Sequence, residues 1–194
     1  MIRFNNNEHG PVPFWFWNGD QQEAEITRQL EHAAEGGVKG MAIHARVGNQ
    51  TEYMSERWFA LTRHTCEEAL RLGLDIWLYD EEGFPSGTVG ERLQKDDPFF
   101  QQKFLTFRYL TGGELATVEN IVAVFDSASY AQIDISDVSA DKEALVFHVT
   151  YHARYVDTLQ PETVERFMEM THERYYTELK DYFGKPLRML ITTA

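Results

Sequence analysis

Three short apolar segments of the sequence each end in polar or charged residues whose chemistry suits ligand binding or proton transfer. The stretch WLYDEEGFPSG (77–87) places three consecutive carboxylates, Asp80, Glu81 and Glu82, directly after the third segment. Carboxylates accept hydrogen bonds from hydroxyl groups, and a pair of them can act as general acid and base. Such a cluster is typical either of an active-site rim or of a solvated loop, and the neighbouring elements decide between the two.

The two preceding apolar segments, VPFWFW (12–17) and GMAIHAR (40–46), end in residues of the same kind. In parallel α/β folds, functional residues gather at the carboxyl ends of the strands, so these side chains are expected to face one common rim. Carboxylates and amides accept hydroxyl protons, and aromatic rings stack on sugar faces. We therefore predict a carbohydrate-binding rim composed of Asn18, Asp20, His44, Arg46, Tyr79, Asp80 and Glu81, with Trp15, Trp17 and Phe84 as further stacking surfaces.

Each of these residues also has a purely structural interpretation. Arg46 can neutralise Asp80 or Glu81, His44 can be an ordinary strand-end histidine, and Asp20 can cap the helix that follows it. Because side chains alternate in direction along an extended chain, at most two of the three carboxylates at 80–82 face the same way. The third is expected to lie in solvent.

Hydrophobic periodicity predicts the elements that position the rim. Ile26, Leu30, Ala33 and Ala34 recur at helical spacing, and Gly36-Gly37 ends that helix. A second helix begins at the N-cap Ser55 and ends before Gly73, with its apolar face formed by Trp58/Phe59, Thr62, Cys66 and Ala69/Leu70. DIWLYD (75–80) then forms a third strand. Units of about 30 residues in the order β-α-β-α-β indicate right-handed crossovers and a parallel sheet.

The alternation of strands and helices stops after the third strand. Alternating runs at 103–110, 120–125, 131–136 and 144–152 predict an antiparallel β insertion. Pro161 then opens a helix with an apolar face formed by Val164, Phe167/Met168, Thr171, Tyr175 and Leu179, and Gly184 with Pro186 ends it. LRMLIT (187–192) is the fourth strand. The expected domains are three βα units (1–89), a β-rich insertion (90–156), and a helix with the fourth strand (157–194), which is half of a TIM-type (β/α)8 barrel or a small open α/β sheet.

Composition excludes several classes of function. The formal charge of −13 and the absence of a Lys/Arg run argue against a nucleic-acid partner. The single cysteine, Cys66, excludes an internal disulfide framework and is expected to be a buried structural thiol. No stretch approaches the roughly 18 apolar residues of a membrane span, and the N-terminus lacks the apolar core of a signal peptide. A cytoplasmic location is the default expectation, with a secreted parent left open.

Other catalytic motifs are absent. THERYY (171–176) lacks the second histidine of a zinc-protease helix, and we expect a solvated or interface helix face there. The sequence contains no GxGxxG after the first strand, no GxxxxGK[ST] and no GxSxG. Nucleotide binding and serine-hydrolase chemistry therefore have no motif to support them.

Four segments occur together in one order: PFWFWNGD (13–20), ITRQLEHAAEGGVKGMAIHAR (26–46), WLYDEEGFPSG (77–87) and YVDTLQPETVERFMEMTHERYY (155–176). Together they resemble the catalytic region of the glycoside hydrolase family 106 α-L-rhamnosidase-like proteins. The resemblance implies a (β/α)8 barrel that hydrolyses glycosidic bonds with two carboxylates. It also implies that His44, Arg46, Asp80 and Glu81 line the sugar-binding end, and that calcium assists cleavage in some members; no calcium ligand is assigned here.

The chain departs from that family at its fourth strand. Family members continue with an acidic segment resembling FTDEP, whereas this sequence reads MLITTA, with Thr192, Thr193 and Ala194 at the matching positions. We therefore expect the N-terminal half of a barrel, inactive alone, with Glu81 as a weak candidate for a catalytic residue. Because half a barrel leaves strand edges and apolar faces uncovered, self-association or a complementary barrel half is expected.

Three hypotheses follow. The favoured one is part of a rhamnosidase-like glycoside hydrolase; the second is a non-catalytic carbohydrate-binding or interaction module. The third is a small α/β protein whose strand-end acids bind a metal.

Overall fold

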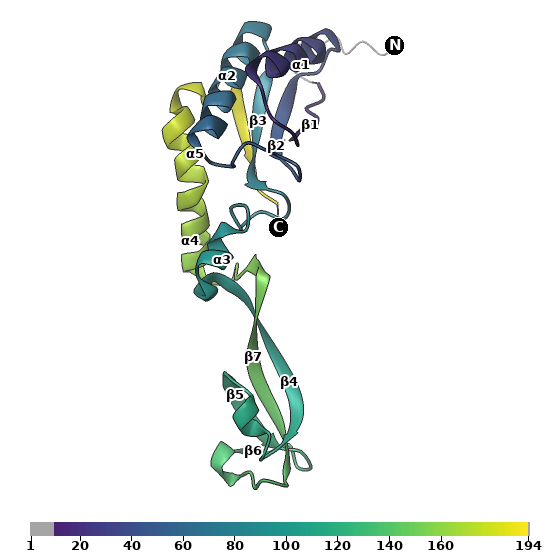
Figure 1. Cartoon of the computed structure of the whole chain (residues 1–194), viewed down its shortest axis with the longest axis vertical. Coiled ribbons are helices and arrows are strands. Elements are labelled where there is room, and N and C mark those ends of the chain that lie inside the picture. The colour runs from purple at the N-terminus through teal and green to yellow at the C-terminus, as the bar shows by residue number, and fades with distance from the viewer. Residues whose placement is uncertain (1–9, 194) are drawn as a thin grey trace. The chain divides into compact units, whose positions relative to one another are not determined.

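The computed structural model describes residues 10–193, which divide into two compact units (Figure 1). The first unit, here called the parallel unit, combines the described residues up to Leu93 with those from Gln160 onward. The second, the antiparallel unit, spans Gln94–Leu159. Each contains one four-stranded sheet, so the protein is a mixed α/β chain with one parallel and one antiparallel sheet.

The sheet of the parallel unit has the strand order β1-β2-β3-β8, and all of its pairs are parallel. Within the described residues it is an open sheet, with β1 and β8 as its edges. Its elements are β1 (Phe14–Trp17), α1 (Glu23–Glu35), β2 (Gly40–Ala45), α2 (Glu56–Leu72), β3 (Asp75–Glu82), α4 (Pro161–Met170), α5 (His172–Leu179) and β8 (Leu187–Ile191), and the short helix α3 (Arg92–Asp96) leads out of the unit.

The caps of α2 confirm the sequence signals. The hydroxyl of Ser55 accepts a hydrogen bond from the backbone N–H of Trp58, and Gly73 ends the helix with a left-handed φ of 72°. For α1 the predicted cap was wrong. Gln22 holds the N-cap position without a side-chain bond, and the Asp20 carboxylate instead accepts from Gln22 and pairs with Arg57 at 3.3 Å.

The last helical segment is two helices rather than one. Thr171 breaks it with φ −121° and ψ −72°, and its hydroxyl donates to the carbonyl of Phe167. The predicted apolar face was partly wrong, because Val164 and Met168 are exposed whereas Thr163 is buried. The other predicted members of the face are buried: Phe167, Thr171, Tyr175 and Leu179.

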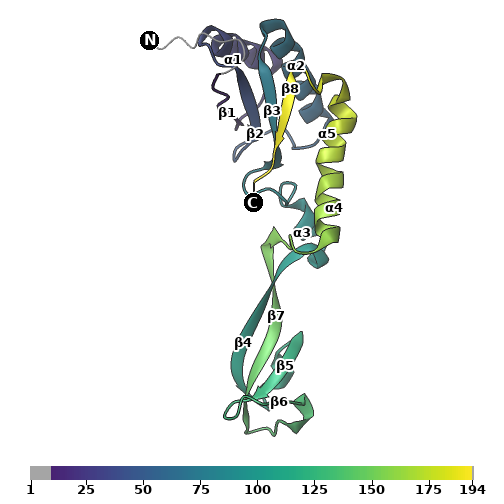
Figure 2. The ribbon, with the colours of Figure 1, turned by 180° about the vertical axis from the view of Figure 1, so that it is seen from behind.

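Helices α1 and α2 cover one face of the parallel sheet, and Figures 1 and 2 show this layer from both sides. Side chains of this layer form the core of the unit, and the largest that are fully buried include Trp17, Ile26, Leu30, Ile43, Trp58, Phe59, Ile76 and Leu78. Cys66 is part of this core, as predicted, and burial raises the pKa of its thiol to about 12.

The antiparallel unit has the strand order β4-β7-β5-β6, with β4 (Gln101–Thr111), β5 (Ile121–Asp126), β6 (Gln132–Ile133) and β7 (Glu143–Val156). Its own small core contains Leu110, Leu115, Val124, Val138, Ala144 and Val146. The strand predicted over 131–136 is shorter than expected. Asp134 accepts from the backbone and hydroxyl of Ser136 and so turns the chain into a 3-10 helix over Ile135–Asp137.

No helix among residues 10–193 combines the length and the apolar character needed to cross a membrane.

Helix α5 is tied to α2 by a buried polar contact, which gives the first prediction. The indole N–H of Trp58 donates to the Tyr175 hydroxyl at 3.1 Å, and both residues are fully buried. Tyr175→Phe leaves that N–H without its acceptor, so we expect the free energy of unfolding to fall by about 1–3 kcal/mol in urea titrations. The neighbouring Tyr176 is largely exposed, and Tyr176→Phe serves as the matched control. Equal stability of the two variants would contradict this assignment.

Candidate functional site

The face of the parallel sheet opposite α1 and α2 presents aromatic side chains. Parallel register places Phe14 beside Ala42, Phe16 beside His44, and Ala42 beside Trp77, so these residues share one face, and Tyr79 lies two residues beyond Trp77 on the same strand. Phe14 is 50% exposed and Phe16 49% exposed. We call the group Phe14, Phe16, His44, Trp77 and Tyr79 the aromatic face.

The alternation of side chains along β1 corrects one expectation. Trp15 and Trp17 were predicted to stack on a sugar, but they point toward the helices and are only 7% and 0% exposed. The indole N–H of Trp15 donates to the side chain of Gln29 on α1, which fixes that ring on the helix side of the sheet. Within FWFW, the two phenylalanines, and not the two tryptophans, therefore lie on the face that was predicted to stack on a sugar.

His44 lies at the centre of the aromatic face. Its ring centroid is 4.0 Å from that of Tyr79 and 5.6 Å from those of Phe14 and Phe16. Its Nε2 lies 2.6 Å from the carbonyl oxygen of Gly83, and since a carbonyl only accepts, Nε2 carries the proton. Nδ1 is then an acceptor, and it has no hydrogen-bond partner among the described residues. Burial lowers the pKa of His44, because the charged ring would lose its hydration.

Arg46 belongs to the same face rather than to the acids. Its guanidinium lies 5.3 Å from the centroid of the Phe16 ring, a cation–π contact. The proposed neutralisation of Asp80 or Glu81 is not found, since neither carboxylate forms an ion pair with Arg46 in the described part of the chain. Arg46 thus adds a partly exposed cation at the edge of the aromatic face.

Asp80 is fully buried and joins three other segments to β3. Its Oδ1 accepts from the hydroxyl of Ser86 at 2.7 Å, and its Oδ2 lies 2.7 Å from Nε2 of His172 and 2.5 Å from the hydroxyl of Thr192. The carboxylate therefore connects the loop after β3, the first turn of α5 and the end of β8.

Glu81 is also fully buried, and it organises the loop that follows its own strand. Its Oε2 accepts from the backbone N–H groups of Gly87, Thr88 and Val89 at 3.0, 2.6 and 2.8 Å. Its Oε1 accepts from those of Glu82 and Gly90 at 2.9 and 2.5 Å. Burial raises the pKa of Glu81, and these backbone donors oppose that effect because they stabilise the charged form.

These positions bear on the predicted role of the acids. Neither Asp80 nor Glu81 has surface open to solvent in this structure, and both are engaged with protein donors. Their assignment as sugar-binding residues stays a prediction. The third carboxylate, Glu82, is only half-buried and accepts a long, 3.4 Å hydrogen bond from Asn49. Asp80 and Glu81 are adjacent in sequence and both buried, yet they bond different groups, at a strand end where the β2–β3 register is irregular.

The remaining predicted site residues lie at the carboxyl ends of the strands. Asn18 and Asp20 are exposed in the turn after β1, and Phe84 is exposed in the loop after β3. The hydroxyl of Tyr79 lies 2.6 Å from that of Thr193 beyond β8. These residues thus border the same end of the sheet, and their part in ligand binding stays a prediction.

Sequence reasoning missed the partners of Asp80. His172 was assigned to a solvated or interface helix face, yet it contacts a carboxylate 92 residues earlier in the chain. Ser86 and Thr192 were noted only as a turn residue and a strand-end residue. Nothing local to these residues signals the pairing, because it depends on how α5 and β8 pack beside β3.

A metal centre finds no support in the described residues. Among residues 10–193, no three His, Cys, Asp or Glu side chains are grouped so that they could hold an ion. Asp80 and Glu81, the strand-end acids on which a metal site would depend, are already hydrogen-bonded to protein groups. The described residues therefore offer calcium no cluster of three such side chains, and the calcium that the family resemblance implies stays a prediction.

Comparisons with known proteins give weak likeness to solved structures. No protein-family model matches the chain, and no curated protein matches it either. A solved structure, the rhamnosidase from Novosphingobium sp. PP1Y, is similar over 57% of this chain with 22% identity and a TM-score of 0.43. The similar region covers 11% of that enzyme. A likeness of this strength establishes neither the family nor the activity of the chain.

The geometry of Glu81 gives the second prediction. In Glu81→Gln, an amide NH₂ replaces one oxygen and faces backbone N–H donors, so several buried donors lose their acceptor. We expect the free energy of unfolding to fall by about 3 kcal/mol or more, measured by urea denaturation. Glu82→Gln is the matched control, because the half-buried Glu82 makes one long bond and should lose less than about 1 kcal/mol. Equal losses in both variants would refute the organising role of Glu81.

His44 gives a prediction about pH. Because its folded-state pKa is lowered, the unfolded chain binds the extra proton first as the pH falls below about 6.5. His44 therefore removes stability below that pH, by at most about 1.4 kcal/mol per pH unit, and contributes no such loss above it. His44→Gln should show a flatter decline of unfolding free energy between roughly pH 6.5 and pH 5. Identical slopes for the parent and the variant would contradict a buried neutral His44.

Proposed function

We propose that the parallel unit is a carbohydrate-binding portion of a glycoside-hydrolase-type barrel, related to the α-L-rhamnosidase-like proteins that the sequence resembles. The observation that carries the proposal is the aromatic face, two of whose phenylalanines are half-exposed on the side of the sheet opposite α1 and α2. In a closed (β/α)8 barrel, the face of the sheet opposite the helices is the interior. The order of the four motif segments in the sequence supports the same reading.

The residues of this face suit a sugar. Phe14 and Phe16 offer apolar ring surface to the C–H groups of a pyranose, and Arg46 beside Phe16 supplies hydrogen-bond donors. Nδ1 of His44 is an acceptor without a partner among the described residues, and it suits a ligand hydroxyl that reaches the ring. At the end of the sheet, Asn18, Asp20 and Phe84 add exposed polar and aromatic groups.

We propose that this portion binds sugar without cleaving it on its own. Glycosidases require two carboxylates placed on either side of the scissile bond. The two acids nearest the expected rim, Asp80 and Glu81, are buried and hydrogen-bonded to protein groups instead. Neither is free to meet a glycosidic oxygen or an anomeric carbon without first giving up those bonds.

The uncovered face also favours association. Phe14 and Phe16 on the edge strand β1 and Met189 on the opposite edge strand β8 are each about half-exposed, and these two edges have unpaired backbone groups within the described sheet. We propose that a further polypeptide segment of barrel type, in a second copy or another chain, covers this face. A sugar can bind between this face and the covering segment, as ligands bind inside barrels.

Sugar titration of the purified chain tests the proposal. Trp77 is the half-buried tryptophan on the aromatic face, whereas Trp15, Trp17 and Trp58 are buried on the helix side, so its fluorescence reports on that face. L-rhamnose should change the fluorescence saturably, and Phe16→Ala should weaken the affinity roughly tenfold. An aryl α-L-rhamnoside should bind in the same way without release of the aryl group.

Phe107→Ala is the control, because Phe107 is an exposed aromatic residue of the antiparallel unit and should leave the affinity unchanged. Absence of saturable binding, or equal loss in both variants, would reject the aromatic face as a sugar site. Turnover of the aryl rhamnoside would reject the non-catalytic part of the proposal.

A further inference from the structure

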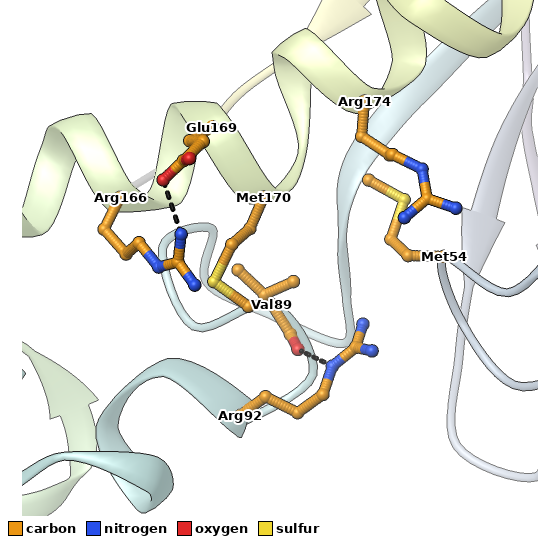
Figure 3. Close-up of a pocket in the computed structure, with 7 residues that line it drawn as sticks. All are labelled: Met54, Val89, Arg92, Arg166, Glu169, Met170 and Arg174. Atoms are coloured by element: carbon orange, nitrogen blue, oxygen red, sulfur yellow. Dashed lines mark hydrogen bonds and ion pairs between the residues drawn. The ribbon is translucent and has the colours of Figure 1, made fainter.

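A second surface of the parallel unit concentrates positive charge. A pocket of about 270 Å³ lies between the residues that follow β3 and the helices α4 and α5 (Figure 3). It is lined by Met54, Val89, Arg92, Arg166, Glu169, Met170 and Arg174. We call it the arginine pocket, because three of its seven lining residues are arginines.

The charge of the lining is unusual for this chain. Three guanidinium groups face one carboxylate, Glu169, so the lining has a formal charge of +2 in a protein whose formal charge is −13. Glu169 pairs with Arg166 at 2.5 Å, and both side chains are about half-exposed or more. An exposed pair of this kind contributes little stability, so an incoming anion competes with it at low cost.

The other two arginines keep donors available. Arg92 uses its Nε for the carbonyl of Val89 and its Nη2 for that of Tyr53, and no described residue bonds its Nη1. Arg174 bonds Glu178 through its Nε at 3.3 Å and lies over the Phe59 ring. A guanidinium presents five N–H donors in a fork that matches the geometry of carboxylate and phosphate oxygens.

The backbone around the pocket is held in uncommon conformations. Val89 has a φ of 54° and Met54 a φ of 63°, both in the left-handed region that is costly for residues with a Cβ, above all a β-branched one. The carboxylate of Glu81 fixes this loop through the N–H groups of Thr88, Val89 and Gly90. Such strain persists where the surroundings enforce it, and it gathers at ligand sites.

The buried acids therefore position the arginines. Glu81 sets Val89, whose carbonyl orients Arg92. Asp80 contacts His172 in the first turn of α5, and Arg174 lies in the same turn. The DEE stretch thus supports the arginine pocket from within, although its own side chains do not line it.

We propose that the arginine pocket binds a small molecule through an oxyanion, a phosphate or a carboxylate group. The guanidinium groups of Arg92, Arg166 and Arg174 bind the oxygens, and Met54, Val89 and Met170 contact the less polar remainder of the ligand. This site is separate from the aromatic face in its lining residues and in its chemistry, and it does not depend on sugar binding.

Calorimetric titration of the full chain with inorganic phosphate and with acetate tests the proposal. At least one anion should bind one site per chain with a Kd on the order of 1 mM or tighter. Tighter binding of phosphate identifies a phosphoryl ligand, and tighter binding of acetate a carboxylate ligand. Arg174→Gln should weaken the preferred anion about tenfold.

Two further variants keep the test decisive. Glu169→Gln removes the competing carboxylate and should tighten binding, on the order of threefold or more, a gain that a folding defect cannot imitate. Arg188→Gln removes the same charge outside the pocket, from a half-exposed arginine paired with Asp75, and should leave the affinity unchanged. No binding of either anion, no gain in Glu169→Gln, or equal losses in Arg188→Gln and Arg174→Gln would overturn the proposal.

Discussion

The carboxylate of Glu81 accepts five backbone N–H groups inside the protein, and the local architecture depends on that cluster. A buried carboxylate is costly unless its oxygens are satisfied, and here the loop itself supplies the donors. The same bonds keep Val89 and Gly90 in left-handed conformations that the loop would not hold alone. A buried charge and a strained loop are each unfavourable. Here the loop supplies the donors that stabilise the charge, and the charge holds the loop in its strained conformation. Asp80 extends this arrangement to α5 and β8 through His172 and Thr192.

Two surfaces of different chemistry are built around this strand end. On the sheet face opposite α1 and α2, Phe14, Phe16 and His44 form an aromatic surface, and burial lowers the pKa of His44, which favours its uncharged form. Beside α4 and α5, three arginines line a pocket. Asp80 and Glu81, which drew attention in the sequence, are fully buried and expose no oxygen on either surface. They instead hold the neighbouring loop and helix in position, which is a common role of charged groups beneath a binding site.

Much of the fold could be read from the sequence, because its signals are local. Ser55 and Gly73 marked the ends of α2 through cap chemistry that acts within one turn. The β-α-β order and the parallel sheet followed from periodicity. The sequence could not show which face of β1 the helices would cover, since FWFW is apolar on both sides and a one-residue change of parity exchanges Trp15 and Trp17 for Phe14 and Phe16. Burial of both Asp80 and Glu81 was equally hidden, because their donors come from a strained loop and from residues about a hundred positions away.

The same reasoning explains why the arginine pocket escaped the sequence. Arg92 follows the β3 loop, whereas Arg166 and Arg174 lie on α4 and α5 after the whole antiparallel unit, so no spacing rule joins them. What brings them together is the placement of α4 and α5 near the residues that follow β3, and the contact of Asp80 with His172 is part of that placement. In a chain with an excess of carboxylates, Arg28, Arg57, Arg63 and Arg71 each pair with an acid. In the arginine pocket, Arg166 and Arg174 also pair with acids, Glu169 and Glu178, whereas Arg92 bonds backbone carbonyls among the described residues. Three guanidinium groups that line one pocket with a single carboxylate favour the attraction of an external anion.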